Sequence, residues 1–192
     1  MDTLHALQAP ELLLRPQLTL IDETPQANMA VVVRDGRFTD VGPAEAVSAR
    51  HPNLVATDLP GRLLMPGFID THNHLTQAYG KALAFGEPSE IFKRIWVPLE
   101  QHLTQEDLQL SAQLAALEAL RGGFTTVCDA GTRSSVGLQA IDDAVSTAGI
   151  RCVLAQICHD LGQTPEQVRA TEAQAGQHLS RYANHNTIHP SL

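Results

Sequence analysis

Between residues 63 and 192 the chain alternates short apolar strand patterns with helical patterns, and this alternation limits the fold more than any other feature. Strands that alternate with helices of this length form βα units around a parallel sheet. The expected helices include residues 105–121, after a capping box, and residues 165–182, after a threonine and a proline. The expected strands cover residues 63–70, 124–128, 150–157 and 187–192.

A parallel sheet of this kind is either an open doubly wound sheet or a closed barrel, and the two place chemistry differently. No glycine-rich phosphate-binding fingerprint follows any of the expected strands, which disfavours a dinucleotide-binding sheet. Barrels build their sites at the C-terminal ends of the strands. Here those ends carry His72, His74, Asp129, His159 and Asp160. We therefore predict an α/β fold of the TIM-barrel type.

The chain is too short for a whole barrel. A complete barrel takes about 250 residues, whereas residues 63–192 number 130, which corresponds to about four βα units. An open half-barrel leaves strand edges unpaired and an apolar interior exposed. We therefore expect an incomplete barrel that is inactive alone and that either aggregates or pairs with a second copy or a complementary piece. We expect the full-length form to be a homo-oligomer.

The first 62 residues predict a separate small β unit. Residues 30–33 and 38–42 are apolar runs joined by Asp35-Gly36, a strong hairpin signal because the turn requires positive φ. Residues 44–50 indicate one or two helical turns, and Pro60-Gly61 precedes the next apolar run. The expected domains are thus residues 1–62 and residues 63–192.

His72 and His74 are the strongest candidates for chemistry. Residues i and i+2 of a strand face the same side about 7 Å apart, so both imidazoles can converge on one ion while Asn73 points away. Neutral imidazoles suit zinc, iron, nickel or manganese. Their place directly after a buried strand favours a metal site at the mouth of a barrel.

Charge and cysteine content exclude several classes of function. The formal net charge of −8, without a basic stripe, would repel a phosphate backbone and argues against nucleic-acid binding. No apolar stretch is long enough to span a membrane and no secretion signal is present, so we expect a cytoplasmic protein. The three cysteines have no C-x-x-C spacing and lie in or near expected strands, which predicts reduced thiols.

Residues 66–74, Pro-Gly-Phe-Ile-Asp-Thr-His-Asn-His, resemble the P-G-[FL]-[IV]-[DN]-x-H-x-H signature of the amidohydrolase superfamily. Residues 95–100 and 115–129 look like the branch that contains cytosine and guanine deaminases, adenosine-type deaminases and triazine hydrolases. The preceding hairpin region resembles that superfamily's N-terminal β domain, a β-sandwich-like unit completed by residues from the far C-terminus.

The resemblance implies a metal-dependent hydrolase of non-peptide carbon–nitrogen bonds, with one divalent ion whose bound water attacks the substrate. Zinc is the expected ion and iron the alternative. The substrate would be a small aminated heterocycle or an amide. His72 and His74 match the first two ligands, whereas the superfamily's other ligands and proton shuttle lie on its fifth, sixth and eighth strands. We assign no catalytic acid or base within these 192 residues.

Five further residues are candidates for supporting roles. Gln77, Trp96 and His159 would contact substrate, against alternative roles in the surface or core. Asp70 and Asp129 would orient the ligand histidines by hydrogen bonds or serve the local structure alone.

Two alternatives remain open. One is a non-catalytic remnant or interaction protein that retains the half-barrel. The other is a dihydroorotase-like dinuclear enzyme, which is disfavoured because its carboxylated lysine lies on the fourth strand and no lysine follows Lys93.

Overall fold

The computed structural model describes residues 7, 9–87, 90–158 and 162–192. The chain divides into two compact units, residues 1–66 and residues 67–192. The boundary thus lies at Pro66, slightly after the position expected from the sequence. Each unit has its own hydrophobic core.

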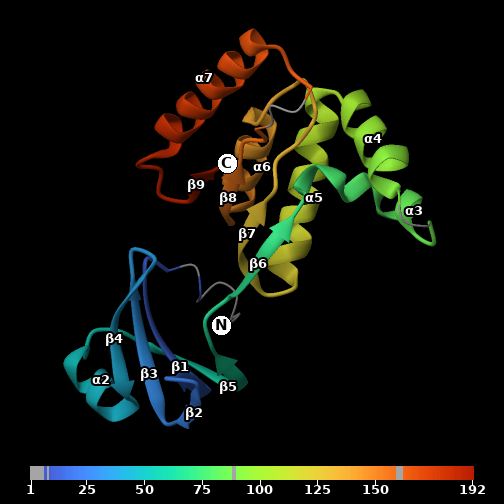
Figure 1. Cartoon of the computed structure of the whole chain (residues 1–192). Coiled ribbons are helices and arrows are strands. Elements are labelled where there is room, and N and C mark those ends of the chain that lie inside the picture. Colours follow the sequence, from blue (N-terminus) through green and yellow to red (C-terminus); the bar gives the residue numbers. More distant parts are fainter. Residues whose placement is uncertain (1–6, 8, 88–89, 159–161) are drawn as a thin grey trace. The chain divides into compact units, whose positions relative to one another are not determined.

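The first unit is a five-stranded sheet with one short helix (Figure 1). The strand β1 pairs with β2 and β3 in antiparallel orientation and with β5 in parallel orientation, and β4 pairs with β3. The helix α2 follows β4. The elements are β1 (Glu11–Ile21), β2 (Thr24–Ala27), β3 (Met29–Arg34), β4 (Arg37–Pro43), α2 (Ala44–Arg50) and β5 (Ala56–Leu64).

The expected hairpin is the β3–β4 pair. Asp35 and Gly36 both have positive φ, 48° and 71°, as a turn of this kind requires. The buried face of β3 packs with Leu13 and with Val47 of α2. Asp40 joins α2 to β4 because it accepts hydrogen bonds from Arg50 and from His51. The Arg50 and His51 hydrogen bonds lower the pKa of Asp40 to about 2.

The second unit is a four-stranded parallel sheet in the order β6-β7-β8-β9, with helices between the strands (Figure 1). The strand–helix alternation expected from the sequence is therefore confirmed as an α/β fold. The strands are β6 (Phe68–Asn73), β7 (Phe124–Asp129), β8 (Arg151–Ala155) and β9 (Ile188–Ser191); the long helices are α5 (Gln105–Arg121), α6 (Gln139–Ala148) and α7 (Pro165–Tyr182).

The helix starts follow local sequence signals. Thr104 caps α5 and Thr164 caps α7, each through a capping box with the residue three positions later. Gly149 ends α6 in the left-handed conformation, with φ of 77°. These local signals mark the starts of α5 and α7 and the end of α6.

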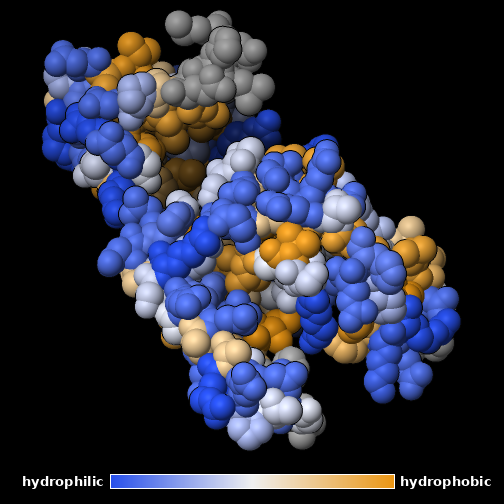
Figure 2. All heavy atoms as spheres, turned by 90° about the horizontal axis from the view of Figure 1, so that it is seen from above, coloured by the Kyte–Doolittle hydropathy of each residue, from blue (hydrophilic) through white to orange (hydrophobic). Residues whose placement is uncertain are grey.

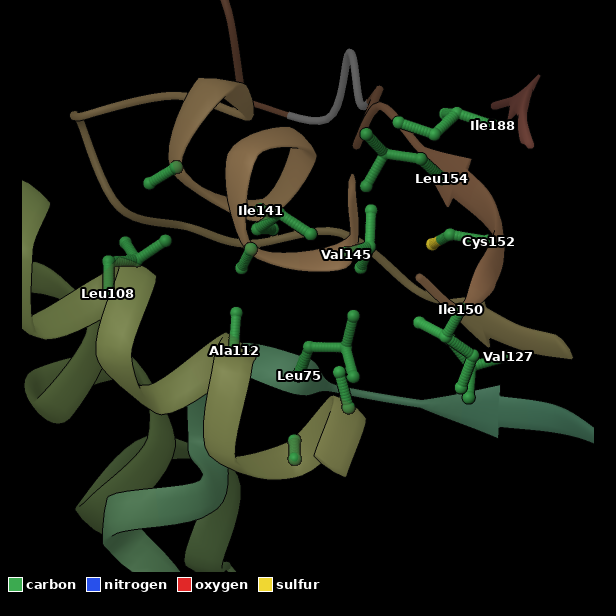
Figure 3. Packing of buried hydrophobic residues seen from close by; sticks show 14 of the residues in the cluster. Leu75, Leu108, Ala112, Val127, Ile141, Val145, Ile150, Cys152, Leu154 and Ile188 are labelled. Carbon is green, nitrogen blue, oxygen red and sulfur yellow. The ribbon is translucent and has the colours of Figure 1, made fainter. Parts of the chain in front are cut away.

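The core of this unit lies between the sheet and the helices α5 and α6 (Figure 3). Figure 3 shows Leu108 and Ala112 of α5 and Ile141 and Val145 of α6 in this core. Its fully buried large side chains include Leu75, Leu108, Ile141, Leu154 and Ile188. Full burial of a leucine or isoleucine side chain stabilises the fold by about 1.5–3 kcal/mol.

The apolar run at residues 63–70 was expected as one strand, and this expectation is wrong. Leu63 and Leu64 end β5 of the first unit, whereas β6 begins at Phe68. Pro66 has no N–H for a ladder hydrogen bond, and a Cβ on Gly67 would lie 2.2–2.8 Å from side-chain atoms of Thr125. The two residues therefore separate the strands at the unit boundary.

The segment after β6 is also more ordered than its sequence suggests. With Gly80 and Gly86, the sequence of residues 77–88 predicts a long mobile stretch, but a 3₁₀ segment, η1 (Leu75–Gly80), leads into the short helix α3 (Lys81–Ala84). A π-helical turn (Phe92–Trp96) then continues directly into α4 (Val97–His102). The sequence predicts a helix from residue 89 to about Trp96 that Pro98 interrupts. In the structure the helical path instead continues through Pro98, which lies in the first turn of α4 directly after the π-helical turn.

The three cysteines are free thiols with different exposure. Cys152 of β8 is buried, Cys128 of β7 is half-buried and Cys158 is exposed. Burial raises the pKa of the Cys152 thiol to about 12. We expect iodoacetamide at pH 8 to label Cys158 first, Cys128 more slowly and Cys152 only after unfolding, as read by peptide mass spectrometry. Early labelling of Cys152 would contradict this packing.

Hydrophobic side chains also reach the surface, and Figure 2 shows orange areas among the hydrophilic ones. On α5, Leu110, Leu114 and Leu117 are 42–52% exposed and share one helical stripe. Phe68 and Ile69 of β6 are at least half exposed. Within the described ranges, no helix is both long and apolar enough to cross a membrane.

Candidate functional site

His72 and His74 lie at the C-terminal end of β6, His72 within the strand and His74 directly after it. Their ring centroids are 5.2 Å apart and the ring planes are nearly perpendicular, at 83°. The Nδ1 atom of His74 faces the carbonyl oxygen of Gly131 at 3.4 Å. A proton on Nδ1 would donate to this carbonyl, which would leave Nε2 of His74 as the free ligand atom.

Both histidines line one pocket of about 400 Å³. The pocket brings together the strand end, the segment η1 and the helices around it. Of the expected supporting residues, Asp70, Gln77 and Trp96 line it as well. Its other lining residues are Asn73, Ala78, Lys81, Ala115, Glu118, Ala119 and Phe124.

Asp70 supports the strand end rather than a histidine ring. Its carboxylate accepts from the backbone N–H of His72 at 3.2 Å and from the side-chain amide of Asn73 at 2.7 Å. Asn73 also lines the pocket, so the expectation that it points away from the histidines is wrong. The cause is local, because the pairing of β6 with β7 shifts register between Asp70 and Asn73 and breaks strict alternation.

Asp129 holds the two loops that flank the histidines. It is 2% exposed, and its carboxylate accepts from the N–H of Leu75 at 2.7 Å and from the N–H of Gly131 at 2.8 Å. Burial raises the pKa of Asp129, although the two backbone hydrogen bonds act in the opposite direction. Since Gly131 carries the carbonyl that faces His74, Asp129 acts on that ring indirectly, through the backbone.

Glu100 is a buried residue of this region to which sequence reasoning gave no role. It is 0% exposed on α4, and its carboxylate accepts from Thr76, Gln77 and the backbone N–H of Arg133. The only available signal was a single acidic residue at the end of the apolar segment 95–100. A carboxylate there is as compatible with the surface as with the core.

Close packing of η1 on the π-helical turn and α4 requires Gly80. A Cβ at this position would lie 2.3 Å from Trp96 Cζ3 and 2.7 Å from Leu99 Cδ2. We expect Gly80→Ala to destabilise the chain by about 1–3 kcal/mol in urea unfolding and to shift the Trp96 emission.

The matched control is Gly176→Ala in α7, where nothing lies within 4 Å of the added Cβ. Alanine in a helix interior is about 0.5–1 kcal/mol more favourable than glycine, so this variant should be more stable. Equal effects of the two substitutions would contradict the packing at Gly80.

Of the remaining candidates, Asp129 does not line the pocket. His159 and Asp160 lie outside the described residues, so the prediction for them stays a prediction. In the described ranges, no group of three or more His, Cys, Asp or Glu side chains is placed to hold a metal ion. The two imidazoles nevertheless fit a divalent transition metal as part of a ligand set, because they are neutral nitrogen donors that share one pocket.

Comparison with models of known protein families gives a match over most of the chain. A model of the Amidohydrolase family matches residues 63–189, which includes the whole parallel sheet almost to its end. The chain belongs to the amidohydrolase family. A second model, the Imidazolonepropionase-like composite domain of bacteria, matches residues 30–53 of the first unit. The superfamily resemblance seen in residues 66–74 is thereby confirmed.

The curated relatives of this amidohydrolase chain include deaminases. A 5-methylthioadenosine/S-adenosylhomocysteine deaminase of Nitratidesulfovibrio vulgaris is 34% identical over 125 residues, 65% of this chain and 28% of the relative. One of Bacillus cereus is 27% identical over 159 residues, 82% of this chain and 36% of the relative. The chain thus spans about a third of the length of these relatives. The finer resemblance to cytosine deaminases and triazine hydrolases stays a prediction.

Solved structures of deaminases share the fold. Guanine deaminase from Bradyrhizobium japonicum superposes with a TM-score of 0.76 at 22% identity, over 95% of this chain and 43% of that one. An adenosine deaminase from Xanthomonas campestris, solved with bound zinc, gives 0.71 at 18% identity, over 94% and 42%. At these identities the similarity shows the fold alone.

Proposed function

We propose that this chain is part of a metal-dependent hydrolase that removes an amine from a small aminated heterocycle. The single observation that carries the proposal is the pocket in which His72 and His74 meet at the C-terminal end of β6. Membership of a family of hydrolases, with deaminases among the relatives, supports the same class of reaction.

His72 and His74 would hold the ion, with zinc favoured and iron as the alternative. A bound ion of this kind lowers the pKa of water and polarises the carbon–nitrogen group under attack. Asp129 keeps the His74 side of the pocket in place through Leu75 and Gly131. Asp70 fixes the backbone of His72, while Gln77 and Trp96 offer a polar and an aromatic wall to a flat ring.

We further propose that the two units are the N-terminal β unit and the first four strands of a barrel. Two imidazoles are one or two ligands short of the usual zinc site, so further strands would supply the rest. In this proposal the complete protein is a cytoplasmic homo-oligomer that binds a small molecule and not nucleic acid. The exposed stripe on α5 and the exposed residues of β6 are where neighbouring barrel elements would pack.

The test compares two polypeptides. One is the 192-residue chain, and the other is the product obtained when the same reading frame is translated past Leu192 to its stop codon. Both are loaded with zinc, and ammonia release is measured from adenosine, 5-methylthioadenosine and guanine. We expect zinc-dependent release from the longer polypeptide alone. Release by the 192-residue chain would contradict the need for further strands, and no release by any zinc-loaded form would contradict the deaminase.

A further inference from the structure

Gly131, in the loop after β7, lies between His74 and the end of β8. Its backbone is buried and left-handed, with φ of 82°. A Cβ at this position would lie 2.8 Å from the carbonyl oxygen of Ala155 and 2.8 Å from Cγ1 of Ile157. Real Cβ atoms essentially never approach other heavy atoms so closely. The loop after β7 thus packs on the end of β8 at a distance that only glycine allows.

Both neighbours of this loop are held in the parallel sheet. Ala155 is the last residue of β8 and pairs with Ser191 of β9, so the backbone that a Cβ would meet belongs to a paired strand. On the side of β6, the N–H of Ala130 donates to the carbonyl of Asn73 at 2.8 Å. A larger residue at position 131 would therefore have to move its own backbone, and the carbonyl with it.

The carbonyl of Gly131 bears directly on the ring of His74. Its oxygen lies 3.4 Å from Nδ1 of His74, near the upper limit for a hydrogen bond, so a small displacement removes the contact. Only the tautomer with its proton on Nδ1 can donate to this oxygen, and that tautomer leaves Nε2 free to accept an ion. Without the carbonyl, nothing in this contact selects between the two ring nitrogens.

We propose that Gly131 is a positioning residue, through which the end of β8 sets the tautomer and the orientation of His74. The missing side chain lets Ala155 and Ile157 hold the loop in place, and the carbonyl of Gly131 then faces Nδ1. The third ligand-free strand end of the sheet thereby acts on a histidine of the first strand. The effect on a bound ion rests on the proposed function, whereas the effect on the tautomer of His74 does not.

The test substitution is Gly131→Ala, and Gly137→Ala is its matched control. Gly137 lies in the same loop with nearly the same φ, 83°, but nothing lies within 4 Å of its added Cβ. Both variants force alanine into the left-handed region, so only the contact with β8 distinguishes them. Ile157→Ala leaves the backbone at position 131 unchanged and removes the side chain packed on it. This third variant decides the matter if Gly131→Ala does not fold.

The experiment reads the tautomer of His74 by nitrogen NMR of the metal-free 192-residue chain with ¹⁵N-labelled histidine rings. At about pH 8.5 the imidazoles are neutral. We expect the proton of His74 on Nδ1 in the wild type and in Gly137→Ala. Gly131→Ala should move it to Nε2 or to a mixture of both, and Ile157→Ala should shift it in the same direction by less. His102 at the end of α4 is the internal reference and should not change.

Zinc affinity, measured by competition with a chromophoric chelator, is the second readout. Gly131→Ala should weaken zinc binding about 10–100-fold, as the loss of a group that orients a ligand does. Gly137→Ala should stay within about twofold of the wild type.

Three results would each overturn the proposal. They are a wild-type His74 with its proton on Nε2, an unchanged tautomer in Ile157→Ala and in any folded Gly131→Ala, and an equal shift in Gly137→Ala. Failure of the proposed function would be distinct, because zinc binding would then be indifferent even to His74→Ala while the tautomer still shifted in Gly131→Ala.

Discussion

Removal of either imidazole, by His72→Ala or His74→Ala, is expected to weaken zinc binding by at least about 100-fold. Loss of a residue that merely orients a ligand already costs about 10–100-fold in metal affinity, so loss of a ligand should cost more. Both rings line the same pocket with centroids 5.2 Å apart, so the loss of either ring leaves one imidazole donor at that strand end. Competition with a chromophoric chelator measures the change.

The matched control for this prediction is His102→Ala. His102 is an exposed imidazole at the end of α4 that faces the carbonyl of Pro98 and does not line the pocket of His72. Its removal should leave the zinc affinity within about twofold. If the three alanine variants bound zinc equally, the ion would be held elsewhere and the assignment of His72 and His74 as ligands would be wrong.

The substitution with the largest expected effect on stability is Asp129→Ala, which should lower the free energy of unfolding by about 2–6 kcal/mol. The carboxylate is almost fully buried and is the acceptor for two backbone N–H groups, those of Leu75 and Gly131. Each buried donor left without an acceptor costs about 1–3 kcal/mol. Urea unfolding followed by circular dichroism gives the value.

Asp129→Asn provides the graded comparison. Asparagine keeps one acceptor oxygen and places an amide NH₂ against the other N–H, so its cost should be smaller, about 1–3 kcal/mol. We expect the free energy of unfolding to decrease from the wild type to Asp129→Asn and further to Asp129→Ala. An alanine variant as stable as the wild type would show that the loops of Leu75 and Gly131 do not depend on this carboxylate.

Much of the fold could be predicted because the relevant signals are local. Thr104 and Thr164 each cap a helix together with the residue three positions later. Asp35-Gly36 forms a two-residue turn with positive φ at both positions. The break at Pro66-Gly67 escaped prediction because the apolar pattern on both sides is continuous. The apolar run at residues 63–70 contributes to a strand in each of two sheets, and the close approach of Gly67 to Thr125, which marks the break between them, is visible only in the three-dimensional structure.

The residues of the site likewise fall into those that a local sequence pattern reveals and those that only the structure reveals. The histidines could be found because both stand at one strand end, two positions apart. Glu100 could not, because its partners lie 24 and 33 residues away and its role depends on burial, which a lone acidic residue does not reveal. The inward position of Asn73 also could not be foreseen, since it follows from a register shift against β7.

X-ray absorption on the zinc-loaded chain tests most directly whether His72 and His74 together bind one divalent ion. We expect one zinc per chain, with two imidazole nitrogens at about 2.0–2.1 Å, and loss of both nitrogen contributions in the His72→Ala/His74→Ala double variant. A zinc spectrum without imidazole ligands, or one unchanged in the double variant, would contradict the assignment.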